Sequence, residues 1–317
     1  MFQDVIADEN VEYIAPAIPY RLQLHSWVER ALYRVHFSRV ANRFFELPFK
    51  KRWYRDFYKG EDRGNMCFVF FMDVLLPQYI PLFEQLRAGY PGCRLVVYLI
   101  DLLASRSGAL EVPLIGQYMD LALSYDKQEA ERYGLAYYPT FMSRLPVPDD
   151  PELDDSDFCF IGAAKNREEV INKLYACLSG YGYRCDFVVL DESARGRGKL
   201  LPGIRTIKKP LSYPAYLAHV KKCRCIVEIQ QTAASGYTLR ALEALLYQKK
   251  LLTSNPAITD YGFYDPDQFL LWSETMDPSA LDAFLSQAVC LDKAEILASI
   301  SPKRFLEVLT ARLNQPS

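Results

Sequence analysis

The chain has 317 residues, of which 50% are hydrophobic, 14% aromatic and 24% charged. This composition is that of a globular protein long enough for two domains, and it excludes a fibrous or largely disordered chain. A formal net charge of −2 gives no overall attraction to nucleic acid, which we therefore do not expect as a partner.

The sequence predicts a cytoplasmic protein without a metal or other cofactor. The N-terminal residues lack the basic region and apolar core of a secretion signal, and no run approaches the roughly 20 apolar residues of a spanning helix. Most of the eight cysteines lie within apolar runs, which is typical of reduced, buried thiols. Cys223 and Cys225 are the one close pair, and the nearest histidine, His219, stands alone, so the spacing predicts no metal site.

The segment from Arg30 to Arg63 is basic and aromatic, with ten basic and four acidic residues. Such a segment indicates a peripheral contact with an anionic lipid surface, where basic side chains attract and rings lie at headgroup level. The alternative is an ordinary amphipathic helix pair that covers a sheet. Pro48 and the mixed spacing interrupt a clean apolar face, and both interpretations stay open.

From residue 67 onward, short apolar runs alternate with longer amphipathic ones, a pattern that predicts βαβ units and a parallel sheet. In the first half of the chain the expected strands are residues 67–72, 94–100 and 121–124, and the expected helices are residues 77–88 and 128–133. Glycines 89 and 134 end these helices. We expect a Rossmann-like domain over residues 1–150.

Residues 145–157 are rich in proline and acid, which predicts a domain linker. The alternation then begins again, with strands expected at 158–161, 187–190, 225–228, 250–253 and 268–272, and helices at 168–178, 213–221, 239–247 and from 278 onward. This predicts a second Rossmann-like domain over residues 151–317. Because open α/β sheets bind ligands beyond the carboxyl ends of their strands, we expect the two domains to face each other across a cleft.

The most informative stretch follows the expected strand 225–228. Gly236 is expected to open a helix whose first-turn amides, at Tyr237 and Thr238, are available to phosphate. Arg240 would grip a diphosphate with its planar fork, and Glu243, about two turns along, would accept hydrogen bonds from a ribose diol. The alternative is that Gly236 only begins a helix on which Glu243 is a solvated charge.

The same stretch resembles the donor-binding segment of GT-B glycosyltransferases. Residues 235–245 read Ser-Gly-Tyr-Thr-Leu-Arg-Ala-Leu-Glu-Ala-Leu, and residues 248–255 read Gln-Lys-Lys-Leu-Leu-Thr-Ser-Asn, most similar to the branch for lipopolysaccharide or capsule biosynthesis. Tyr-Asp-Lys at 125–127, Tyr-Gly-Leu at 133–135, Tyr-Pro at 138–139 and residues 157–167 resemble the same branch. The resemblance implies that Gly236, Thr238 and Arg240 contact the phosphates of the donor, and that Glu243 contacts its ribose. The residues predicted to bind the donor here are Ser235, Gly236, Tyr237, Thr238, Arg240 and Glu243.

Two positions depart from that family. Many retaining GT-B enzymes carry a second glutamate where this chain has Ser235, and the branch tends to place His-Pro where this chain has Gln231 and Thr232. The resemblance therefore leaves open both the anomeric outcome and the sugar.

A second phosphate contact is expected at residues 162–167, Gly-Ala-Ala-Lys-Asn-Arg, between a strand and a helix. Amides after the expected turn at Gly162, together with Lys165 or Arg167, would neutralise a leaving diphosphate. The alternative is a loop before a helix that carries solvated charges.

A general base is expected at the carboxyl end of a strand in the first domain. Asp101 is the first candidate, and Asp126 and Asp73 follow other strands in the same way. Each of these aspartates has the alternative role of a helix cap.

The resemblance implies a glycosyltransferase that moves a sugar from a nucleotide-diphosphate-sugar donor to a bacterial surface glycan, in lipopolysaccharide or capsule. A lipid-linked acceptor would suit the basic, aromatic segment. The alternatives are a GT-B-like epimerase, a phospho-polyol transferase, or a sugar-nucleotide-binding subunit without catalytic activity.

Overall fold

The computed structural model describes residues 3–14, 27–36, 58, 60–61, 64–71, 79–103, 112–165, 167–191, 200–230, 236–289 and 293–315. The chain divides into two compact units. One, here the C-unit, is Met1–Asp4 with Thr140–Leu306, and the other, the N-unit, is Val5–Pro139 with Glu307–Ser317. The chain passes from the N-unit to the C-unit between Pro139 and Thr140, which is before the boundary expected at residue 150. It returns to the N-unit for Glu307–Ser317.

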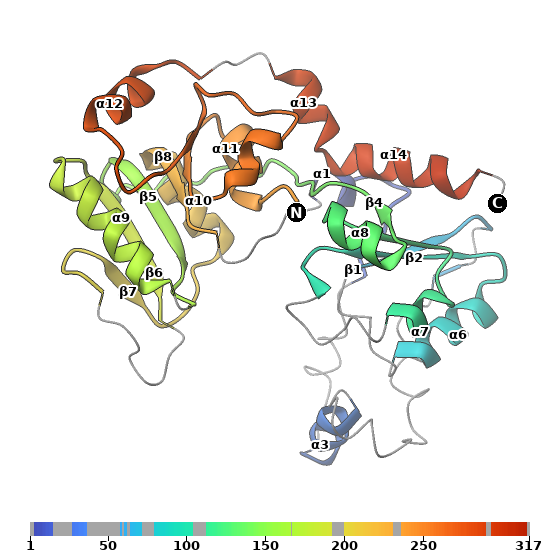
Figure 1. The fold of residues 1–317 in the computed structure, drawn as a ribbon. Helices are drawn as coiled ribbons and strands as arrows, with labels where there is room; N and C mark the ends of the chain where they lie inside the picture. Colours follow the sequence, from blue (N-terminus) through green and yellow to red (C-terminus); the bar gives the residue numbers. More distant parts are fainter. Residues whose placement is uncertain are drawn as a thin grey trace. The chain divides into compact units, whose positions relative to one another are not determined.

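The N-unit contains a parallel sheet of order β1-β2-β3-β4. Figure 1 labels β1, β2 and β4 of this sheet. Its strands are β1 Cys67–Phe71, β2 Arg94–Leu99, β3 Leu121–Ser124 and β4 Ala136–Tyr137. The helices between these strands are α6 Ile80–Gly89, α7 Val112–Gly116 and α8 Lys127–Tyr133. The chain also forms α1 Gln3–Ile6, α3 Trp27–His36 and α14 Pro302–Leu313. The predicted strands of this half are confirmed. β4 was not expected, because two residues make no visible apolar run.

Strand β2 shows why this sheet forms. Five of its six residues are buried, because a parallel strand is covered on both faces and therefore reads as a continuous apolar run. Leu95 packs with Phe83 of α6 and Ile115 of α7 in one core, and all three are fully buried. The core fixes β2 at the centre of the unit.

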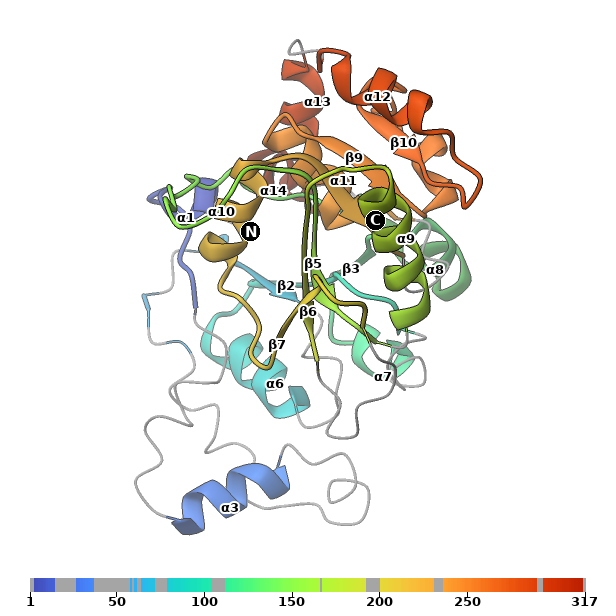
Figure 2. The ribbon, with the colours of Figure 1, turned by 90° about the vertical axis from the view of Figure 1, so that its left-hand side faces the viewer.

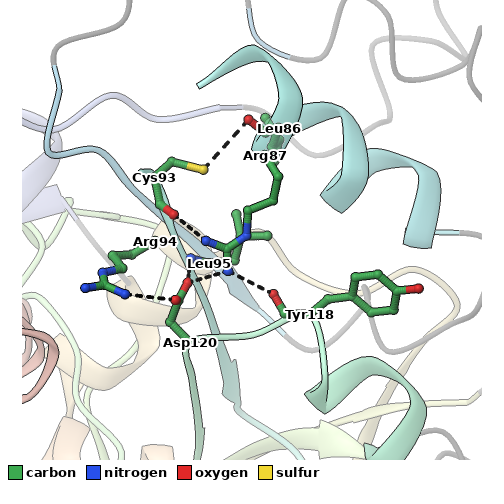
Figure 3. Close-up of polar contacts among 7 residues, drawn as sticks. All are labelled: Leu86, Arg87, Cys93, Arg94, Leu95, Tyr118 and Asp120. Carbon is green, nitrogen blue, oxygen red and sulfur yellow. Dashed lines mark hydrogen bonds and ion pairs between the residues drawn. The ribbon is translucent and has the colours of Figure 1, made fainter. Parts of the chain in front are cut away.

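Asp120 joins the amino-terminal ends of β2 and β3 (Figure 3). Its carboxylate accepts hydrogen bonds from the Leu95 amide at 2.7 Å, Arg87 Nη2 at 2.7 Å and Arg94 Nη1 at 3.1 Å. Arg87 also donates to the carbonyl oxygen of Cys93 at 2.6 Å. Burial opposes ionisation, but the Leu95 amide and the two guanidinium groups hold the pKa of Asp120 below its usual value. This cluster lies at the edge opposite the carboxyl ends of the strands.

The C-unit contains a parallel sheet of order β10-β9-β8-β5-β6-β7. Its strands are β5 Ser156–Ala163, β6 Cys185–Leu190, β7 Arg205–Ile207, β8 Cys223–Glu228, β9 Lys250–Thr253 and β10 Phe269–Leu271. Its helices are α9 Glu168–Gly180, α10 Tyr213–Lys222, α11 Leu239–Leu246, η3 Pro256–Asp260, α12 Pro278–Ser286 and α13 Ala294–Ser299. The strand order reverses between β5 and β8, as in the doubly wound dinucleotide-binding fold.

Helices cover both faces of this sheet. Figure 2 shows α9 and α10 on opposite sides of β5 and β6. Side chains alternate along β5, so Phe158 and Phe160 pack with α9 and α12 while Cys159 packs with α10 and α11. Both faces are therefore dry, and polar groups gather at the ends of the strands.

Three local expectations were wrong. The turn expected at Gly162 is not there, because β5 continues to Ala163 and Gly162 pairs with Val189. Gly236 does not open the next helix, which begins at Leu239 as the expected helix 239–247 does. The expected linker is not devoid of core contacts, because Leu145 and Val147 pack against the C-unit core.

No helix within the described ranges combines the length and the apolarity that crossing a bilayer requires.

Candidate functional site

The carboxyl edge of the C-unit sheet brings together the ends of β5, β8 and β9 and the start of α11. The reversal of strand order between β5 and β8 is where open α/β sheets leave a crevice for ligands. Ser235 and Asn166 lie outside the described residues.

Thr238 is the N-cap of α11. Its side-chain oxygen accepts a hydrogen bond from the Ala241 amide at 3.2 Å, and its backbone is extended. The N-cap is the residue before the first helical residue. The first helical residues are therefore Leu239 and Arg240 rather than Tyr237 and Thr238. The first turn of the helix therefore lies later in the chain than the first-turn amides that the sequence predicted.

Gly236 and Tyr237 are held by aromatic side chains. The Tyr261 hydroxyl donates to the carbonyl oxygen of Gly236 at 2.7 Å, and Asn255 Nδ2 donates to that hydroxyl at 3.0 Å. The Tyr237 ring lies 4.7 Å from the Tyr261 ring and 4.8 Å from the Phe263 ring. These contacts anchor the chain just before α11.

Arg240 and Glu243 form an ion pair inside the C-unit. Arg240 Nη1 lies 2.6 Å from Glu243 Oε2, and Tyr216 of α10 donates its hydroxyl to the same oxygen at 2.7 Å. Arg240 Nη2 donates to the carbonyl oxygen of Ile161 in β5 at 2.7 Å, and its guanidinium lies 4.0 Å from the centre of the Tyr216 ring. Glu243 is 2% exposed, so it is not the solvated charge of the alternative interpretation.

This pairing sets the charge and direction of the Arg240 guanidinium. Burial lowers the pKa of Arg240, but the charge of Glu243, its hydrogen bond to Arg240 and the interaction with Tyr216 together raise that pKa above its ordinary value. The side chain keeps 27% exposure. A guanidinium has five N–H donors, and each terminal nitrogen here uses one in these contacts, so further donors remain for an anion.

Glu228, at the end of β8, was missed by the sequence analysis. It is 7% exposed, and Thr253 of β9 donates its hydroxyl to Glu228 Oε2 at 2.6 Å. Burial raises the pKa of this carboxyl, although hydrogen bonds from the hydroxyls of Thr253 and Thr238 act against the shift. The sequence offered one signal for this residue, an acid at the end of an apolar run that is typical of a strand covered on both faces. Burying a charge is costly, so an acid in such a place indicates specific partners.

Arg167 connects the ends of β5 and β8 through hydrogen bonds. Its guanidinium donates to the carbonyl oxygen of Ile229 after β8, and to that of Ala163 at 2.5 Å. Burial lowers the pKa of Arg167, and the charge of Glu228 opposes that shift. Lys165, in the same loop, is exposed and has a positive φ of 42°. Of the two cations predicted here, Lys165 is the one that faces solvent.

Two of the three predicted bases, Asp101 and Asp126, follow strands of the N-unit at the carboxyl edge of its sheet. Asp101 follows β2, and its Oδ1 accepts from the Leu102 amide at 3.0 Å. Asp126 follows β3, is 2% exposed and caps α8 through the Glu129 amide at 2.9 Å. Glu129, another buried acid that the sequence analysis missed, accepts from the Leu103 amide at 3.1 Å. Asp73 lies outside the described residues.

Across the ranges that the structure describes, no three or more histidine, cysteine, aspartate or glutamate side chains are grouped to hold a metal ion.

No family model matches the chain, and no curated protein matches it. Among solved structures, the chain is similar to TarM, with a TM-score of 0.53 and 9% identity over 84% of this chain and 58% of TarM. It is also similar to accessory secretory protein 1, 2 and 3 of Streptococcus pneumoniae, with a TM-score of 0.50 and 9% identity over 82% of this chain and 55% of that chain. The chain thus spans little more than half the length of these two proteins.

A third similar structure is the apo form of the lipopolysaccharide outer core galactosyltransferase WaaB, with 16% identity over 91% of this chain and 82% of that chain. Its TM-score of 0.42 supports no further conclusion. The solved structures that resemble this chain include GT-B glycosyltransferases, and another is a putative UDP-N-acetylglucosamine 2-epimerase from Listeria monocytogenes. At these identities the likeness concerns the fold, which is the predicted GT-B fold with parallel α/β sheets.

Proposed function

We propose that this chain is a glycosyltransferase that uses a nucleotide-diphosphate-sugar donor and a bacterial surface glycan acceptor, in lipopolysaccharide or capsule. The observation that carries the proposal is the position of Arg240. It lies in the first turn of the helix that follows β8, at the reversal of the strand order, and it is held there by Glu243 and Tyr216.

In the proposed reaction, an acceptor hydroxyl attacks the anomeric carbon of the donor. The bond between that carbon and the phosphate oxygen breaks, and its electron pair leaves with the nucleoside diphosphate. The first amides of α11, Arg240 and exposed Lys165 stabilise the charge that develops on the leaving group. Asp101 takes the hydroxyl proton in an inverting transfer. Glu243 orients Arg240, and its contact with ribose remains part of the proposal.

The proposed acceptor is lipid-linked, and the protein meets it at the cytoplasmic face of the membrane. Most of the basic segment from Arg30 to Arg63 lies outside the described residues. Helix α3, which includes its start, exposes 75% of Trp27 and 45% of Val28. Aromatic and apolar side chains next to basic ones favour an anionic interface.

Thermal unfolding with candidate donors tests this proposal, because a ligand that binds the native state raises the midpoint. We expect UDP-, GDP- or dTDP-hexose to raise it for the wild type and for Arg184→Lys, whose side chain is exposed, but much less for Arg240→Lys. Incubation with an acceptor glycan and mass analysis then separates transfer from epimerisation or polyol-phosphate transfer. Binding of a donor without turnover would point to a non-catalytic subunit, and no binding of any donor would refute the proposal.

A further inference from the structure

Glu228 occupies an enclosed position between the start of α11 and the end of β9. The hydroxyl of Thr253 accepts a hydrogen bond from the Asn255 amide at 3.0 Å, and the hydroxyl of Thr238 accepts one from the Ala241 amide at 3.2 Å. Each hydroxyl still has its own hydrogen to donate: Thr253 donates to Glu228 Oε2 at 2.6 Å, and Thr238 also hydrogen-bonds with this carboxyl. The carboxyl joins the cap of α11 to the turn after β9.

The charged groups that interact with Glu228 balance one another. Arg240 of α11 and Arg167 of the loop after β5 attract its charge, while Glu243 of α11 repels it. Tyr261, after η3, also interacts with it and is neutral, since burial raises its pKa above the usual range. Both guanidinium groups donate to backbone carbonyls of neighbouring strands. With both glutamates ionised, this cluster of two cations and two anions has no net charge to offer a diphosphate.

We propose that Glu228 takes up a proton when a nucleotide-diphosphate-sugar binds beside α11, so that donor binding is coupled to protonation of this buried carboxyl. The proposal rests on the proposed donor site. Protonation leaves the cluster with one net positive charge, which favours an anion. A protonated carboxyl also keeps an acceptor oxygen for the threonine hydroxyls, so the turn before α11 is preserved.

The direction of the coupling follows from linkage. Burial already raises the pKa of Glu228 in the free protein, and a nearby diphosphate raises it further. Binding therefore consumes protons at any pH around or between these two values. Donor affinity falls as the pH rises through that interval, by up to about tenfold per pH unit.

Isothermal titration calorimetry in buffers of different ionisation enthalpy measures this uptake. The probes are UDP-glucose, GDP-mannose and dTDP-glucose, whose phosphates are diesters without the second phosphate ionisation near pH 6. For the probe that binds, we expect about 0.3 to 1 proton taken up per nucleotide in the wild type at one or more pH values between 5.5 and 8. In Glu228→Gln, which imitates the protonated acid, we expect no uptake from this group and a flatter dependence of affinity on pH.

Glu169→Gln is the matched control, because it removes the charge of an exposed glutamate in α9 with 82% side-chain exposure. Its uptake should equal that of the wild type. If Glu228→Gln does not fold, Thr253→Val removes one donor to the carboxylate and should move the uptake profile to higher pH. Donor binding without proton uptake, or uptake that persists in Glu228→Gln, overturns this inference and leaves the proposed function standing. If none of the probes binds, the donor site fails, and the inference fails with it.

Discussion

Arg240 and Glu243 lie one turn apart in α11, and Glu243 Oε2 accepts both the 2.6 Å contact from Arg240 and the 2.7 Å hydrogen bond from Tyr216. A carboxylate that serves two donors in a buried place holds the guanidinium at a fixed angle. The pair is therefore part of the fold as well as of the proposed donor site, and changes to either residue have two separable effects.

Glu243→Ala should destabilise the protein as well as weaken donor binding. The change leaves the Arg240 charge and the Tyr216 hydroxyl without their shared acceptor, and breaking a buried ion pair costs about 3 kcal/mol. Urea denaturation measures the free energy of unfolding. Glu169→Ala, at an exposed pair with Lys173, should leave it nearly unchanged. Equal stability of Glu243→Ala and wild type would contradict the buried pair.

Arg240→Lys should lower donor affinity and turnover more than stability. Lysine keeps the charge but cannot contact Glu243, the Ile161 carbonyl and a phosphate in one plane. Losing a charged hydrogen bond costs about 1.5 to 3 kcal/mol, so we expect at least about a tenfold loss of kcat/KM. Steady-state kinetics of Arg240→Lys, with Arg184→Lys as the control, measures this loss. Full activity of Arg240→Lys with every donor would remove the arginine from the site.

Asp101→Asn should reduce transfer by about 10² to 10⁴-fold while leaving donor affinity unchanged, because the amide keeps the shape and removes the proton acceptor. Asp126→Asn should retain nearly the full rate, since asparagine caps a helix as well as aspartate does. Rates of both variants and of Asp73→Asn, measured with donor affinity, decide the assignment. A large loss at Asp126 or Asp73 with none at Asp101 would move the base to that residue.

Asp120→Asn should cost stability at neutral pH and little at acid pH. The pKa of Asp120 is lowered in the folded protein, so its ionised form contributes stability above the unfolded value, and this contribution is lost as the pH falls through the folded value. The two arginine contacts and the Leu95 amide predict a loss of about 1 to 2 kcal/mol at pH 7. Chemical denaturation from pH 7 to pH 2.5 measures the difference between variant and wild type, which should shrink with acid.

The exposed pair of Asp155 and Lys222 is the control for that experiment. Its nitrogen and oxygen are 3.6 Å apart, and Asp155 has 69% side-chain exposure. Asp155→Asn should leave the free energy of unfolding nearly unchanged at each pH. A constant difference between Asp120→Asn and wild type down to pH 2.5 would show that the ion pairs of Asp120 do not provide its stabilisation.

The sequence by itself determined the parallel α/β organisation, and it also supplied the segment that we propose binds the donor. Strands such as β2 and β8 are covered on both faces, and that burial requires continuous apolar runs that can be recognised without a structure. Strand β7 was not predicted, because its three residues are exposed or half-buried and form no apolar run. It pairs with β6 through its backbone.

Only the tertiary structure decided what surrounds the charged residues. Glu243 is paired within its helix, but its burial depends on Tyr216 of α10, and Arg240 is fixed by Ile161, 79 positions away in the chain. The sequence shows Glu228 as an acid that ends an apolar run, but only the packing of β9 and α11 shows that Thr253 and Thr238 are its partners. Local sequence encodes which elements form, whereas the pKa and the partners of a buried charge depend on groups that only folding brings within a few ångströms.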